Sequence, residues 1–158
     1  MNNKQQINRL KDMAELAWAS YFEFDLLKDA NNIPRKIYEL DSNGNKIKDE
    51  NSPRGHKEIE VTLEHIASIK YQKQEVLVNL QQDNTWQSNV LNFLNEKTNT
   101  DKLKGDFSPT QAKNFFERYD LLKHCPNTDS GFSATLFQNK HTKEYILSIR
   151  GTESKKVA

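Results

Sequence analysis

The chain has 158 residues, of which 35% are hydrophobic and 28% are charged, and its formal net charge at pH 7 is +1. This length favours one domain, and the balanced charge gives no basic footprint that points to nucleic acid. The sequence contains no apolar run of about 18 residues or more, so it predicts no transmembrane segment.

The N-terminus and the cysteine content bear on where the protein is located. Met1 to Gln6 is polar and lacks the apolar core of a signal peptide. Cys125 is the single cysteine, which excludes an internal disulfide and favours a reducing compartment. We therefore expect a cytoplasmic protein, or one secreted by a route that needs no N-terminal signal peptide.

Apolar residues at helical spacing predict a first helix from about Asn3 to Leu27. The main interpretation is a helix that faces the core. The alternative is a helix that lies on a lipid surface, and the acidic residues Glu15, Glu23 and Asp25 argue against it.

A small hairpin is predicted over residues 36–48, because Asn43-Gly44 is a strong signal for a tight turn. The turn runs from Asp41 to Asn45, and its alternating oxygen-bearing side chains also suggest a calcium loop. The spacing argues against calcium, since the glycine is fourth instead of sixth and Ser52 stands where a glutamate is needed.

Helical spacing continues from Thr62 to about Lys97 and predicts two helices with a break near Asp83-Asn84. His65 lies on the same predicted helix face as Ile66. No second residue at metal-binding spacing accompanies this histidine, so no metal site is predicted.

A polar linker over residues 95–105 suggests a division into a helical region, residues 1–103, and a second region, residues 104–158. Ser108, Pro109 and Gln111 carry the start signals of another helix. Its apolar residues run from Ala112 to Leu122, and we expect it to end at Pro126.

The final stretch, Gly131 to Thr152, shows two runs of alternating apolar and polar residues around a polar turn, which predicts a β-hairpin. The second run leads into Arg150-Gly151-Thr152. A glycine followed by a hydroxyl residue can offer a backbone N–H and an O–H to an anion, as acyl-transfer enzymes require.

The segments Ser133–Phe137 and Tyr145–Glu153 resemble the opening hairpin of bacterial lipases of the lipase class 3 type, which have an α/β-hydrolase fold. Phe107–Ala112 and Phe115–Tyr119 resemble the helix that precedes this hairpin. In these lipases the residue after Arg-Gly lines the oxyanion hole. The resemblance therefore assigns that role to Thr152.

The sequence departs from this family where the nucleophile is expected. A Gly-x-Ser-x-Gly motif should come after the Arg-Gly-Thr strand, and none is present. Gly131–Thr135 is a near miss that lacks the second glycine. We therefore expect an α+β protein, mostly helical before its hairpin, that corresponds to an incomplete α/β-hydrolase, truncated before the nucleophile elbow and inactive alone.

Two further interpretations stay open at this stage. The chain could instead be a non-catalytic helical module that binds a protein partner, or that self-associates through the hairpin edge.

Cys125 beside His124 is a poor catalytic pair, because neighbours in sequence rarely face one another. No cofactor is predicted, and a lipid ester is expected as substrate only if a C-terminal half completes the protein.

Overall fold

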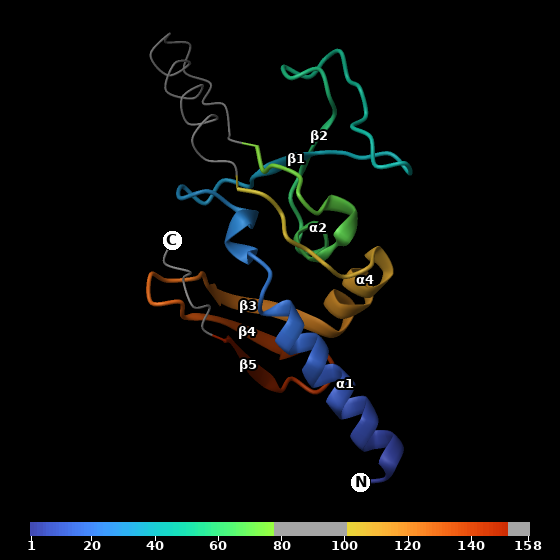
Figure 1. Cartoon of the computed structure of the whole chain (residues 1–158), viewed down its shortest axis with the longest axis vertical. Helices are drawn as coiled ribbons and strands as arrows, with labels where there is room; N and C mark the ends of the chain where they lie inside the picture. Colours follow the sequence, from blue (N-terminus) through green and yellow to red (C-terminus); the bar gives the residue numbers. More distant parts are fainter. Residues whose placement is uncertain (78–100, 152–158) are drawn as a thin grey trace, which may run out of the picture. The chain divides into compact units, whose positions relative to one another are not determined.

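The computed structural model describes residues 1–77 and 101–151 (Figure 1). The chain forms two compact units: unit 1 joins Met1–Asp25 to the segment that begins at Thr110, and unit 2 is Leu26–Pro109. The boundary predicted at residues 103 and 104 lies a few residues before the chain passes from unit 2 to unit 1. Both helix and sheet are present, as expected for the α+β class. Among the described residues, no helix combines the length and the apolar character needed to span a membrane.

Unit 1 begins with helix α1, Asn3–Ala19. Asn2 caps it, because its side chain accepts a hydrogen bond from the Gln5 backbone N–H at 2.9 Å and its own backbone N–H donates to the Gln5 side-chain oxygen. The predicted helix was too long, since α1 stops before Ser20, whose hydroxyl donates to the Ala17 carbonyl. The chain then turns and places Phe24 in the short 3-10 helix η1, Phe24–Leu27.

The C-terminal part of unit 1 contains helix α4, Pro109–Arg118, and three strands: β3, Tyr119–Cys125; β4, Ser133–Asn139; and β5, Tyr145–Arg150. The predicted hairpin is confirmed as β4 and β5. The predicted extent of the preceding helix was wrong, because α4 ends at Arg118 and the next residues form β3. These residues pair with β4 in an antiparallel ladder, with a bulge between Leu121 and Lys123.

One face of this sheet, in the order β3-β4-β5, carries the core of unit 1. Helix α1 lies across that face in Figure 1. Phe137 on β4 contacts Phe115 of α4 and Phe24 edge to face, at ring-centroid distances of 5.5 Å and 6.2 Å. Such aromatic pairs each add about 0.5–1.5 kcal/mol beyond the burial of their area. Aromatic packing therefore holds α4 and Phe24 against the sheet.

The opposite face of the sheet is apolar and open at β5. Tyr145, Leu147 and Ile149 alternate with the residues that face α1, and they are 65%, 60% and 60% exposed. Among the described strands, β5 pairs with β4 alone. This strand is consequently an edge with an uncovered apolar row.

Unit 2 contains a two-stranded sheet of β1, Lys36–Tyr38, and β2, Glu58–Glu60. The turn predicted from Asp41 to Asn45 is present, and Leu40 pairs with Lys46 beyond it. The hairpin predicted over residues 36–48 was only partly correct, because its first strand, β1, pairs with β2. The hairpin within residues 36–48 is thus one part of a longer pairing.

The Asp41 carboxylate closes that turn instead of facing outward as a ligand. Its Oδ1 accepts hydrogen bonds from the backbone N–H groups of Asn43 at 2.8 Å and Asn45 at 2.9 Å. These bonds lower the pKa of Asp41, and the bond from the Asn45 N–H has the largest effect. Gly44 supplies the positive φ of 83° that the turn requires.

The long helix predicted from Thr62 was wrong over its described part. Helix α2 covers only Leu63–Ala67, and the 3-10 helix η2, Ile69–Tyr71, comes next. The backbone then pairs with a distant segment, because the Ile69 N–H donates to the Phe107 carbonyl and the Lys73 N–H to the Leu103 carbonyl. The remaining part of that prediction, including the break near Asp83-Asn84, lies outside the described residues.

Candidate functional site

The predicted oxyanion residue, Thr152, lies one residue beyond the described segment, so the structure shows only the strand that leads to it. That strand, β5, is tied to the first helix: the Ser148 hydroxyl donates to the Leu16 carbonyl at 3.1 Å. Nearer its end, the Arg150 guanidinium lies 5.0 Å from the centre of the Tyr21 ring. A Cβ atom added to Gly151 would lie 3.4 Å from the Tyr21 hydroxyl oxygen. The backbone before Thr152 is therefore held against the segment that comes after α1.

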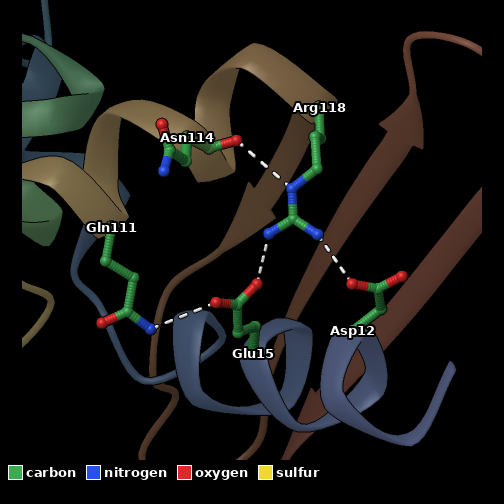
Figure 2. A network of polar contacts seen from close by, with 5 residues as sticks. All are labelled: Asp12, Glu15, Gln111, Asn114 and Arg118. Atoms are coloured by element: carbon green, nitrogen blue, oxygen red, sulfur yellow. Dashed lines mark hydrogen bonds and ion pairs between the residues drawn. The ribbon is translucent and has the colours of Figure 1, made fainter. Parts of the chain in front are cut away.

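A polar cluster links α1 to α4 (Figure 2). The Arg118 guanidinium donates to Asp12 at 2.7 Å and to Glu15, and its Nε donates to the Asn114 carbonyl. Gln111 donates to the second oxygen of Glu15. Burial lowers the pKa of Arg118, but its hydrogen bonds to Glu15 and Asp12 and the charges of these carboxylates outweigh burial and raise the pKa overall. These contacts form an ionic clamp between α1 and α4.

A cleft of about 470 Å³ lies beside this clamp, between α1 and the sheet. It is lined by Gln5, Asn8, Arg9, Asp12, Met13, Leu16, Tyr119, Asn139, Glu144 and Ile146. Burial, followed by the charge of Asp12, raises the pKa of Tyr119. The lining includes no serine, cysteine or histidine, so this cleft does not provide the groups for acyl transfer.

A hydroxyl, an imidazole and a carboxylate form a series on the inner face of the sheet. The Thr135 Oγ1 lies 2.8 Å from His124 Nδ1, and His124 Nε2 lies 3.6 Å from an oxygen of Asp25. The sequence pattern did not reveal this series, because it predicted His124 at a helix end. In the structure His124 stands on β3 directly opposite Thr135 on β4.

This series does not have the exposure that a nucleophile needs. Thr135 is fully buried, and the side chain of His124 is 7% exposed. The Phe24 ring covers the imidazole edge to face at 5.6 Å. An ester carbonyl cannot reach the Thr135 hydroxyl in this arrangement, so the contact satisfies a buried polar group.

Cys125 and His124 point to opposite faces of β3, because successive residues of a strand alternate. His124 meets Thr135 on the inner face, whereas the Cys125 thiol lies 3.8 Å from the Pro126 carbonyl. The two residues therefore form no thiol–imidazole pair. Within residues 1–77 and 101–151, no group of three or more His, Cys, Asp or Glu side chains could hold a metal ion.

Comparison with protein-family models, with curated proteins and with solved structures found no match for this chain.

Proposed function

We propose that this chain is the N-terminal piece of a lipase- or phospholipase-like serine ester hydrolase, which lacks the Ser-Asp-His triad and is inactive alone. The observation that carries the proposal is the position of β5. This strand leads into Arg150-Gly151-Thr152 while it forms the open edge of a three-stranded sheet. An α/β sheet that continues beyond β5 would cover that edge.

The uncovered apolar row supports the same proposal. Sheets of α/β proteins are packed with helices on both faces. Here the helices of unit 1 cover one face, and the other presents Tyr145, Leu147 and Ile149. Helix α1 also keeps exposed apolar residues towards its start, at Ile7 and Leu10. Both features suit an incomplete α/β-hydrolase whose further strands and helices would bury them.

The chemistry proposed for Thr152 is electrostatic assistance. Its backbone N–H and its hydroxyl would donate to the oxyanion of the tetrahedral intermediate, and the residue after the nucleophile would supply a second donor. Removal of one oxyanion donor typically lowers turnover about 10²–10³-fold. Thr152 would therefore assist an ester hydrolysis that the nucleophile starts. A lipid ester is the proposed substrate class of the completed protein, in the cytoplasm or after secretion without an N-terminal signal peptide.

The test begins with the coding sequence downstream of the Ala158 codon, read in all three frames. A Gly-x-Ser-x-Gly motif with an aspartate and a histidine after it supports the proposal, and its absence from every frame overturns it. The protein joined to that continuation is expected to hydrolyse a p-nitrophenyl ester. Thr152→Ala should then lower kcat about 10²–10³-fold, whereas Thr142→Ala in the exposed hairpin turn should leave it unchanged.

The isolated chain provides a second arm of the test. It is expected to release no p-nitrophenol from a short-chain ester above the rate of buffer. The proposal is contradicted if the purified chain hydrolyses the ester and loses this activity when one of its own serines is replaced.

A non-catalytic interaction module is the second candidate function. The exposure of Tyr145, Leu147 and Ile149 on an edge strand favours it, because an uncovered apolar row beside unpaired backbone groups is a typical protein-binding surface.

A further inference from the structure

The backbone of β5 offers hydrogen bonds at its open edge. The Asn139 N–H donates to the Glu144 carbonyl at 2.9 Å, which makes these two residues a hydrogen-bonded pair. Bonded and non-bonded pairs alternate along an antiparallel ladder. Tyr145, Leu147 and Ile149 therefore direct their N–H and C=O groups away from β4, towards the open edge.

The same three residues also carry the exposed apolar side chains of β5. Among the residues that the structure describes, this row combines backbone groups directed at the sheet edge with an apolar surface on the face that the helices of unit 1 leave uncovered. A strand that pairs with β5 would gain ladder hydrogen bonds and cross-strand apolar contacts at once.

The charges at the two ends of β5 specify which strand fits. Glu144 precedes the strand and Arg150 ends it, and both lie on the side-chain row that faces α1. An antiparallel copy of the same strand, centred on Leu147, places Glu144 opposite the partner's Arg150 at both ends. Ile149 then lies opposite the partner's Tyr145, and Leu147 opposite the partner's Leu147.

We propose that two copies of this chain pair through β5 in this register and form a continuous six-stranded sheet. Other registers that keep the side chains on the same faces lose the charge pairing. A shift of the pairing by two residues in one direction places Glu144 opposite the partner's Ser148. The same shift in the other direction places Arg150 opposite the partner's Ile146. The two-fold register is therefore the one in which apolar residues and charges are both matched.

This inference does not rest on the proposed ester hydrolase function. Dimerisation is proposed for the 158-residue chain by itself, whereas the hydrolase function depends on a continuation that carries the nucleophile and would occupy the same edge of β5. A chain that stays monomeric would overturn the dimer but not the hydrolase function. A coding sequence without the nucleophile motif would overturn the hydrolase function but not the dimer.

A charge exchange across the interface tests the register. Glu144→Arg and Arg150→Glu each place like charges opposite one another at both ends of the pairing. We expect the unchanged chain to sediment as a dimer, and each variant to raise the dimer dissociation constant at least about tenfold, which corresponds to about 1.4 kcal/mol. An equimolar mixture of the two variants should restore the dimer, because arginine then faces glutamate at both ends.

The mixture separates pairing from misfolding. Arg150 also contacts Tyr21, so Arg150→Glu could disturb unit 1, but a misfolded variant would not regain a partner on mixing. Recovery in the mixture supports the proposal. A monomer of the unchanged chain at every concentration, or single variants that dimerise as well as the unchanged chain, overturns it.

A cross-link provides a second measurement in the Cys125→Ser background. Leu147→Cys would place two thiols beside the two-fold axis, where the Cα atoms of a hydrogen-bonded antiparallel pair lie about 5.5 Å apart, within reach of a methanethiosulfonate cross-linker with a one-carbon spacer. Ile149→Cys is the matched control, because its two copies would be four residues out of step, about 14 Å apart. The cross-linker should join the first variant and spare the second. If both cysteine variants are cross-linked equally, or if neither is, the proposed two-fold register is contradicted.

Discussion

The Ser148 hydroxyl donates a 3.1 Å hydrogen bond to the Leu16 carbonyl and so joins the last described strand to the first helix. Both residues are buried. The same carbonyl accepts the Ser20 N–H at 3.2 Å, at the point where α1 ends. The end of the helix and the strand that leads to Thr152 are therefore held by one acceptor.

Ser148→Ala should destabilise unit 1 because the substitution removes this donor from a buried carbonyl. We expect the free energy of unfolding to fall by about 0.5–1.5 kcal/mol, measured by urea denaturation. Ser42→Ala, at an exposed turn position, is the control and should change the value little. A loss at position 148 no larger than the loss at position 42 would show that the bond contributes nothing.

Arg118→Ala removes the cation between Asp12 and Glu15. We expect a loss of about 1–2 kcal/mol, because bonds to charged groups are strong but the guanidinium is partly exposed. Lys113 and Glu117 lie 4.0 Å apart on the same helix and are largely exposed, so Lys113→Ala is a matched control with an expected loss below about 0.5 kcal/mol. Thermal unfolding at low and high salt should show a smaller Arg118→Ala effect at high salt.

Gly105→Ala should be among the most damaging single substitutions in unit 2. A Cβ at this position would lie 2.3 Å from the Ile66 carbonyl oxygen and 2.4 Å from the Ala67 carbonyl carbon. Both are backbone atoms, so the clash cannot be relieved by a rotamer change, and we expect a loss of at least about 2–3 kcal/mol.

Gly44→Ala is the comparison for that experiment. Nothing lies within 4 Å of its Cβ position, but its φ of 83° is unfavourable for alanine, at about 1–2 kcal/mol. Circular dichroism during heating should therefore rank Gly105→Ala below Gly44→Ala in melting temperature. The reverse order would contradict the close approach at Gly105.

His65 predicts a pH dependence of stability in unit 2. Its Nδ1 accepts a hydrogen bond from the Thr62 backbone N–H at 3.1 Å, and the His65 backbone N–H donates to the Thr62 hydroxyl. The two bonds form a capping box with histidine in the place of glutamate. Burial lowers the pKa of His65 in the folded state, against opposing effects of the Glu60 backbone and the Glu64 charge.

The folded state consequently favours neutral His65. Its contribution to stability is complete above the unfolded pKa of about 6.5 and is lost as the pH falls from there through the lower folded pKa. His65→Gln keeps an acceptor for Thr62 but does not titrate. Urea denaturation at pH 7.5 and 5.5 should show that the stability of the unchanged chain relative to His65→Gln decreases at the lower pH. An equal difference at both values would exclude a titrating cap.

The sequence by itself determined the elements whose cause is local. Alternation and turn chemistry predicted the β4–β5 hairpin, the Asp41–Asn45 turn is a consequence of Asn-Gly, and the Ser108-Pro109 signal predicted the start of α4. These features depend on residues a few positions apart, so their physical causes can be read along the chain.

Only the tertiary structure decided where two helical patterns stop. Tyr119–Cys125 has spacing that suits a helix, but β4 offers it a ladder of hydrogen bonds, and the chain becomes β3. After α2, the backbone finds its partners at Leu103 and Phe107, which only the folded chain brings near. The contact of His124 with Thr135 is likewise a cross-strand neighbour, invisible until the register is known. Long-range hydrogen bonds thus override local propensity, because a segment takes whichever pairing satisfies its backbone while it buries its apolar face.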